Sequence, residues 1–190
     1  MNRMFRPHPV RPARRSGGLT LMELLIALAV LAVVLGLAAP SMQSLLLQAQ
    51  LRSEGSRLLN AVQLARSEAA ARFRPVSICP AVQAAAGELR CGGTYGDGWL
   101  VLEGLPQDAV IEPARLLRLY HSVPDGYRVA DRAGADAVGA FTYYPDGATR
   151  RNLTLSVCSR QRPDLAGWSV VINRVGRARL ARDWGRCEAV

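Results

Sequence analysis

Two stretches of the sequence combine residue types whose spacing could do chemistry. Near the N-terminus, Gly18 precedes a long apolar run whose only charge is Glu23. Near the C-terminus, five arginines fall within thirteen residues: Arg174, Arg177, Arg179, Arg182 and Arg186. The two histidines, His8 and His121, are far apart, and CxxC, HExxH and GxxxxGK[ST] patterns are absent. We therefore expect a protein that is not an enzyme and that holds no metal or cofactor.

The positive charge is concentrated at the two ends of the chain. All 24 basic residues are arginines, against 15 acidic residues, which gives a formal net charge of +9. Residues 1–18 carry five arginines and no acid, residues 19–149 have a net charge of −2, and residues 150–190 have a net charge of +6. A basic protein can bind anionic partners such as nucleic acid or lipid headgroups. Each basic end therefore needs its own explanation.

The N-terminal end predicts a leader followed by a membrane helix. Residues 1–18 are rich in proline and arginine and have no apolar periodicity, which is typical of a targeting segment. A helix over residues 19–40 would span roughly 30 Å, the thickness of a bilayer's hydrocarbon core. Because the arginines precede this span, we expect a cytoplasmic N-terminus and an exported remainder.

Glu23 is unusual at the start of a membrane span, because an unpaired carboxylate there costs on the order of a few kcal/mol. Cleavage after Gly18 would create an α-ammonium group at Leu19, about one helical turn away. That ammonium group could pair with Glu23 of the same subunit or of a neighbour.

The run Gly18-Leu19-Thr20-Leu21-Met22-Glu23 resembles the processing site of type IV pilins and type II secretion pseudopilins. The resemblance implies that prepilin peptidase cuts after Gly18 and methylates Leu19, and that Glu23 helps subunits dock in a filament. Leu19 stands where phenylalanine is usual. Two alternatives are an ordinary signal peptide cut near residues 36–39 and a plain membrane anchor that does not assemble.

Residues 41–74 have the pattern of an amphipathic helix that ends near Arg72. Gly36 and Pro40 are expected to kink the helix or to melt it locally. Apolar residues recur every three, four or seven positions, at Leu47, Leu51, Leu58, Val62, Ala65 and Ala69. Polar residues lie between them, at Arg52, Glu54, Arg57, Gln63 and Glu68. The apolar stripe should pack on a sheet.

Residues 75–190 read as short strands separated by Gly- and Pro-containing turns. The predicted strands are 76–79, 99–103, 116–120, 141–144, 153–158, 168–172 and 177–181, and residues 81–90 and 132–139 are expected to be loops. The fold class is therefore α+β, with one long N-terminal helix packed on an antiparallel sheet domain. The resemblance implies that this is the type IV pilin fold.

Four cysteines in an exported domain imply disulfides. Three connectivities are possible, and we favour Cys79 with Cys91 and Cys158 with Cys187, because these pairs close the shortest loops. The alternative is a free catalytic cysteine, which would need a nearby base.

Three further motifs narrow the resemblance to one group of these proteins. Arg66-Ser67-Glu68-Ala69, Asp97-Gly98-Trp99 and the run from Trp168 to Arg177 resemble the GspH/FimT group of minor pilins and minor pseudopilins. Gly176-Arg177-Ala178-Arg179 is similar to the glycine-arginine-any-arginine motif of FimT-type competence pilins. For those pilins the motif implies binding of DNA for uptake in natural transformation.

The arginines can also be interpreted without the resemblance. In a strand over 177–181, Arg177 and Arg179 would share one face, and Ala178 and Leu180 the other. Arg174, Arg182 and Arg186 would extend the exposed cluster, which could contact successive phosphates in a salt-sensitive way. Trp184 is expected to be buried under the tail, with stacking on a base as its alternative role. The competing interpretations are an edge strand protected by charge, and contacts with acidic patches of neighbouring subunits.

Two functions follow from these patterns. The first is a minor type IV pilin of the bacterial inner membrane or pilus tip, with a periplasmic domain, pilin-subunit partners and a DNA-binding surface. The second is an H-type minor pseudopilin of a type II secretion system that has no DNA role.

Overall fold

The computed structural model describes residue 18 and residues 20–83, 87–106 and 110–188, without the side chains of residues 37–41. The predicted leader, apart from Gly18, and the predicted methylation site Leu19 lie outside the described residues. The chain forms two compact units, Met1–Gln43 and Ser44–Val190. The second unit contains both sheets and the hydrophobic core.

Helix α1 runs from Leu21 to Arg72. The backbone remains helical through Gly36 and Pro40, so the expectation of local melting there is wrong. Proline removes one backbone donor, but the turns on either side keep the remaining hydrogen bonds of the helix. Among the described residues, no helix combines the length and the apolar character needed to cross a membrane.

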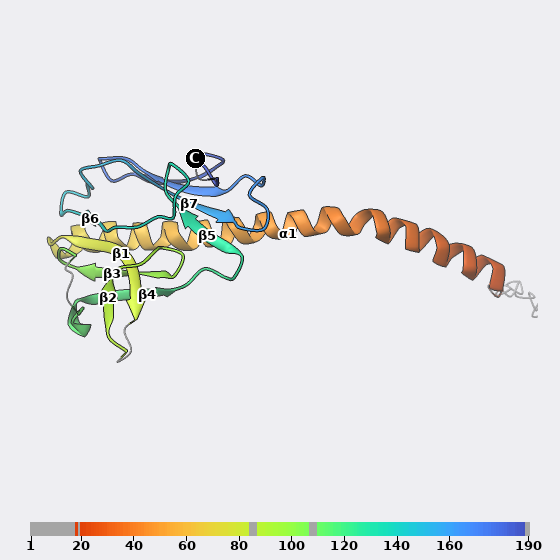
Figure 1. Cartoon of the computed structure of the whole chain (residues 1–190), viewed down its shortest axis with the longest axis horizontal. Helices are drawn as coiled ribbons and strands as arrows, with labels where there is room; N and C mark the ends of the chain where they lie inside the picture. Colours follow the sequence, from red (N-terminus) through yellow and green to blue (C-terminus); the bar gives the residue numbers. More distant parts are fainter. Residues whose placement is uncertain (1–17, 19, 84–86, 107–109, 189–190) are drawn as a thin grey trace, which may run out of the picture. The chain divides into compact units, whose positions relative to one another are not determined.

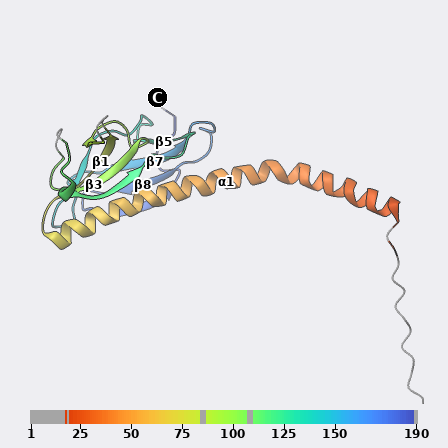
Figure 2. The ribbon, with the colours of Figure 1, turned by 90° about the horizontal axis from the view of Figure 1, so that it is seen from below.

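The second half of α1 buries the predicted stripe. Leu51, Leu58 and Val62 are fully buried, as are Ala65 and Ala69, and Leu47 is half-buried. These residues pack with residues from both sheets in one cluster, which includes Val76 and Ile78 from one sheet and Leu155, Val170 and Ile172 from the other. Figures 1 and 2 show the strands gathered along the end of α1 that finishes at Arg72.

The sequence pattern predicted that Glu54 lies on the exposed face of the helix, and this prediction is wrong. Glu54 is only 7% exposed, because it stands three residues after Leu51 on the same face of the helix. Its carboxylate lies 2.9 Å from the Arg57 guanidinium and accepts a hydrogen bond of 3.2 Å from Gln50. Arg57 also donates to the backbone oxygen of His121, at 3.1 Å. The buried charge is therefore compensated by neighbours on its own helix.

The first sheet is antiparallel and has the order β2-β1-β3-β4, with β6 also paired to β1. Val76 begins β1 and pairs with both Glu103 of β3 and Tyr143 of β6. A short 3₁₀ helix, Pro113–Arg115, precedes β4. The strands are β1 (Val76–Gln83), β2 (Leu89–Cys91), β3 (Gly98–Glu103), β4 (Leu116–His121) and β6 (Phe141–Tyr143).

The second sheet has the order β5-β7-β8-β9, with all neighbours antiparallel. Its strands are β5 (Tyr127–Ala130), β7 (Leu153–Ser159), β8 (Trp168–Ile172) and β9 (Ala178–Arg182). Strand β9 lies at the edge of this sheet and pairs Arg179 with Val171. It carries the predicted arginine strand, shifted by one residue.

Two strands were missed from the sequence. Strand β2 overlaps residues 81–90, which were expected to be a loop and into which β1 also extends, and β2 is held by pairing of Ala81 with Cys91. Strand β5 has only four residues, which is too short for a clear alternating pattern, and it pairs along β7. Residues 132–139 form turns and a single bridge, from Asp136 to Ala130, as their weak pattern suggested.

The burial of Leu58 leads to a stability prediction for the unit formed by residues 44–190. Leu58→Ala should lower the free energy of unfolding by about 2–5 kcal/mol, because it leaves a cavity between the helix and the sheets. Gln63→Ala, on the exposed side of the same helix, should change it by less than about 0.5 kcal/mol. Urea unfolding of the two variants would measure the difference. Equal effects would contradict the packing of the stripe.

Candidate functional site

The arginines near the C-terminus lie on and after a hairpin formed by β8 and β9. Its connecting turn is held by Asn173, whose side-chain oxygen accepts from the Arg177 backbone at 2.8 Å. The Gly176 backbone donates to the Asn173 backbone oxygen, also at 2.8 Å. A further bond of 2.9 Å joins the Arg174 backbone to the Asn152 side chain. The turn that presents Arg174 and Arg177 is therefore fixed by hydrogen bonds to the backbone.

Gly176 has a structural role in this turn. It is buried and has a φ of +80°, and a Cβ added to it would lie 1.7 Å from the backbone oxygen of Gly147. The Tyr143 hydroxyl donates to the Gly176 backbone oxygen at 3.2 Å. Burial raises the pKa of Tyr143 to about 12, against an opposing effect of the Arg66 charge, so the hydroxyl stays protonated at neutral pH. Gly176 thus allows the turn to pack against residues 143–147.

The strand alternation places the arginines of β9 on two sides. Leu180 faces α1, since its Cδ1 atom is 3.0 Å from where a Cβ on Gly55 would stand. Arg179 therefore points to the outer face, and it is exposed, as is Arg177. Arg182 pairs with Trp168 and has the same parity as Leu180, so it lies on the helix side of the sheet edge. Exposed arginines thus flank both sides of β9.

An additional arginine, Arg66 of α1, lies beside this strand. A groove of about 440 Å³ is lined by Arg66, Val171, Asn173, Arg177, Ala178 and Arg179. Sequence reasoning missed Arg66 as a candidate, because its position next to Arg177 depends on how α1 packs on the sheet. We call the exposed side chains of Arg66, Arg174, Arg177, Arg179, Arg182 and Arg186 the arginine surface.

The arginine surface differs in its pairing from seven other arginines of the described residues, although Arg52, Arg118, Arg132, Arg151 and Arg160 also form no ion pair there. Within the part of the chain that the structure describes, none of its six members forms an ion pair. Arg72, for example, lies 2.6 Å from Glu68, and the hydrogen bonds that it donates to Glu68 and Glu103 raise its pKa. The arginines with carboxylate partners are Arg57, Arg72, Arg74, Arg90, Arg128, Arg150 and Arg162. The surface can therefore bind external anions without first breaking a described ion pair.

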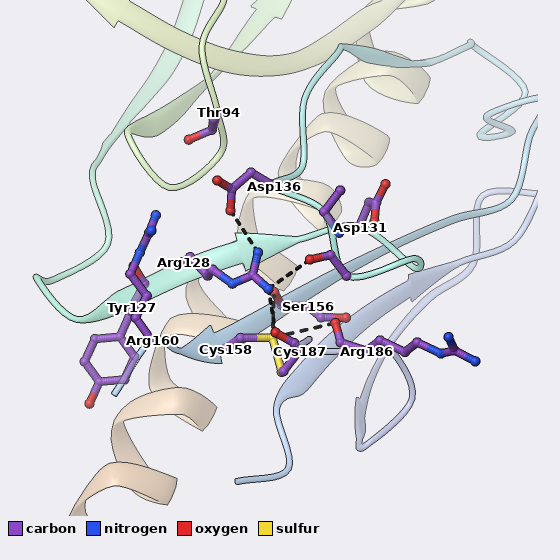
Figure 3. Close-up of polar contacts among 12 residues, drawn as sticks. Thr94, Tyr127, Arg128, Asp131, Asp136, Ser156, Cys158, Arg160, Arg186 and Cys187 are labelled. Carbon is purple, nitrogen blue, oxygen red and sulfur yellow. Dashed lines mark hydrogen bonds and ion pairs between the residues drawn. A yellow bond between two sulfur atoms is a disulfide. The ribbon is translucent and has the colours of Figure 1, made fainter. Parts of the chain in front are cut away.

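The tail after β9 is fastened across the outer face of the second sheet. Cys187 forms a disulfide with Cys158 of β7, and Arg128 of β5 donates to the backbone oxygen of Cys187 (Figure 3). Arg128 is itself held by Asp136 at 3.1 Å, as Figure 3 also shows. Arg128 was not singled out from the sequence, because its role depends on the unpredicted strand β5. The tail that carries Arg186 is therefore covalently and electrostatically fixed.

All four cysteines are in disulfides, and the pairs are those favoured from their spacing. Cys79 is bonded to Cys91, and Cys158 to Cys187, each with a Cα–Cα distance of 5.5 Å. The alternative of a free catalytic cysteine is therefore excluded. In the described part of the chain, no group of three or more His, Cys, Asp or Glu residues could hold a metal ion.

Trp184 was expected to be buried under the tail, and this expectation is wrong. Its side chain is 51% exposed, and the Arg179 guanidinium lies 4.6 Å from the centre of its ring. The backbone on either side is held down, which leaves no room for the ring beneath it: Gly185 donates to Ser169 at 3.2 Å, and a Cβ on Gly185 would lie 2.0 Å from the Ser156 hydroxyl.

The second candidate site, at Gly18 and Glu23, lies in the other compact unit. Gly18 and Glu23 are both exposed. The Thr20 hydroxyl accepts a hydrogen bond of 3.2 Å from the Glu23 backbone, so Thr20 caps the N-terminus of α1. Glu23 falls in the first turn of the helix, where a negative charge is favourable. This position stabilises the helix end whether or not Glu23 also docks to another subunit.

Comparison with known proteins identifies the family. The profile of the family described as "Type II transport protein GspH" matches residues 54–176, more than half of the chain. The chain belongs to the GspH family. The prokaryotic N-terminal methylation motif matches residues 13–39, which include Gly18 and Glu23. This GspH-family protein is therefore a minor pilin or pseudopilin. The family match ends at Gly176, so Arg177, Arg179, Arg182 and Arg186 lie beyond it.

Solved structures share the fold. The type IV minor pilin FimU of Pseudomonas aeruginosa is 21% identical, with a TM-score of 0.54, over 74% of this chain and 97% of FimU. The minor pseudopilin EpsH of the Vibrio cholerae type II secretion system is 13% identical, with a TM-score of 0.50, over 70% of this chain and 97% of EpsH. A search of curated proteins gave no match. These likenesses confirm the pilin-type fold: a long helix packed on antiparallel sheets.

The geometry at Gly176 predicts that adding a single methyl group there strongly lowers the free energy of unfolding. Gly176→Ala should destabilise the 44–190 unit by more than about 4 kcal/mol, because the added Cβ would overlap the Gly147 backbone. Gly139→Ala is the matched control: its φ is +79°, but nothing lies within 4 Å of the added Cβ. It should cost only the backbone strain, about 1–2 kcal/mol. Urea unfolding would compare them, and equal costs would show that the contact with Gly147 is unimportant.

Proposed function

We propose that this protein is a minor pilin of a type IV pilus, which takes part in pilus biogenesis and binds DNA for uptake in natural transformation. The arginine surface would bind the DNA. The observation that carries the proposal is that the six exposed guanidinium groups have no ion-pair partner among the described residues. Three of them line one groove beside the edge strand.

The chemistry of this surface suits a polyphosphate better than a single small anion. The guanidinium groups extend from the turn at Arg174, along β9, to the tail at Arg186, so they could contact successive phosphates. Such contacts depend on charge and not on base sequence. Uptake of DNA of any sequence requires this kind of recognition. The fixed turn and the disulfide-bonded tail reduce the entropy that binding would cost.

The N-terminal features complete the proposal. Prepilin peptidase would cut after Gly18 and methylate Leu19, in line with the match to the methylation motif. Residues 19–40 would anchor the protein in the bacterial inner membrane or pack in the filament, with the domain on the periplasmic side or at the pilus tip. Glu23 would help other pilin subunits dock. The leader arginines, which precede the apolar run, agree with a cytoplasmic N-terminus.

A second candidate function is that of a minor pseudopilin in a type II secretion system. The name of the matched family and the fold shared with EpsH favour it. In that case the arginines would contact acidic partner subunits, or would protect β9, which is an edge strand, from pairing with other chains. This candidate predicts no measurable affinity of the arginine surface for DNA.

DNA binding by the 44–190 unit tests the first proposal, because this unit lacks the leader arginines. Arg177→Ala combined with Arg179→Ala should lower duplex affinity about tenfold or more at low salt. It should also reduce the slope of log affinity against log salt by about 2, one for each lost phosphate contact. Fluorescence anisotropy over a salt series would measure both quantities.

The control removes the same charge elsewhere. Arg90→Ala with Arg162→Ala also deletes two exposed arginines, which pair with Glu88 and Asp164. This variant should retain most of the affinity and of the salt slope. If both double variants behave like the unmodified protein, or if none of the proteins binds, the DNA function is wrong.

Cleavage after Gly18 and methylation of Leu19 would give the membrane-bound protein a defined mass. Intact mass spectrometry should show a chain that begins at Leu19 and carries one extra methyl group. Cleavage near residues 36–39 would instead indicate a signal peptide, and an uncut chain would indicate a plain anchor. Either of these results would exclude assembly as a pilin.

A further inference from the structure

Trp184 is the most exposed of the three tryptophans. Trp99 is fully buried and Trp168 is half-buried, with the Arg52 guanidinium 5.3 Å from its ring centre. Trp184 is 51% exposed. A large ring left in water forgoes the stabilisation that burial would give, so its exposure requires a cause.

The cause is the backbone on either side, which is fixed at three points. The Asp183 backbone donates to the Gly167 backbone oxygen at 2.9 Å, and the Gly185 backbone donates to the Ser169 hydroxyl at 3.2 Å. Two residues further on, Cys187 is bonded to Cys158. The ring is therefore carried on a rigid segment, and little entropy would be lost when it binds a partner.

Arg179 lies over the ring at 4.6 Å and belongs to the arginine surface. The cation–π contact keeps the ring next to a guanidinium that can contact phosphate. In single-stranded DNA, a base and the phosphate attached to it are neighbours, and the base has an open face. In duplex DNA, the bases are already paired and stacked, so only the phosphates are accessible to this surface.

We propose that Trp184 stacks on an unpaired nucleobase, so that the arginine surface binds single-stranded DNA in preference to duplex DNA. This inference rests on the proposed DNA function and names the form of DNA that the surface recognises. Stacking supplies an attraction for single strands that phosphate contacts alone do not. The occupant is a nucleic acid and not an apolar protein surface, because the Arg179 guanidinium lies over the ring and Arg186, two residues further along the chain, is also exposed.

The test uses the full chain in detergent micelles, in which the leader arginines contribute equally to every variant. The probes are a short oligothymidine and a hairpin duplex of the same total charge. Trp184→Leu should weaken oligothymidine binding about tenfold and change duplex binding by less than about twofold. Trp184→Phe, which keeps an aromatic ring, should retain most of the single-strand affinity. Arg177→Ala should weaken both complexes, because Arg177 would contact phosphate.

A second measurement needs no variant. Saturating oligothymidine should quench tryptophan emission of the unmodified protein, and Trp184→Phe should remove most of that quenching, since Trp99 is fully buried and Trp168 is half-buried beside Arg52. Absence of quenching at saturation would overturn the stacking proposal. So would an equal loss of single-strand and duplex affinity in Trp184→Leu, which would mean that the ring only positions Arg179.

The outcomes separate this inference from the proposed function. If Arg177→Ala weakens binding and Trp184→Leu has no effect, DNA binding stands and base stacking is wrong. If no variant alters binding of either probe, both are wrong. Thermal unfolding midpoints within a few degrees of the unmodified protein would show that the variants are folded.

Discussion

The burial of one face of α1 between two sheets is the constraint on which the domain depends. Leu51, Leu58 and Val62 are in the same core cluster as residues of β1, β7 and β8, so the helix covers one apolar face of each sheet. The helix also joins the two sheets, since its buried residues belong to one core cluster with residues of both. A change on this face would therefore affect both sheets at once.

The same packing determines where the positive charge is displayed. Gly55 lets α1 approach Trp168 and Leu180 closely, so Leu180 faces the helix. Because side chains alternate along β9, Arg179 then points away from the helix. The turn at Gly176 rests on residues 143–147, and Tyr143 belongs to the first sheet. The position of the arginine surface thus depends on contacts with the first sheet, and Arg66 of the helix belongs to it, although its other five members come from thirteen consecutive residues.

The sequence predicted those features that depend on local pattern. The period of the Leu and Ala residues gave the helix and its buried stripe, and alternation together with turn residues gave strands such as β8 with their bounds nearly correct. The predictions from sequence were wrong or missing where tertiary contacts determine whether a strand forms or a side chain is buried. Glu54 is tolerated on the buried face because Arg57 and Gln50 compensate it. Strand β5 exists because it pairs along β7, and Arg66 joins the site only through packing. Trp184 is exposed because the backbone on either side is fastened to the sheet.

The net charge of a protein is a poor guide to where it binds anions, and the pairing pattern explains why. Residues 19–149 carry ten arginines and twelve acids, and several of these arginines, such as Arg72 and Arg74, are bound to carboxylates of the same segment. Residues 150–190 carry only three acids, so most of their nine arginines have no local partner. Exposed, unpaired guanidinium groups keep their full capacity to bind phosphate, whereas paired ones would first have to give up a hydrogen bond. The excess positive charge of the folded domain therefore lies in residues 150–190, whereas residues 19–149 have a net charge of −2.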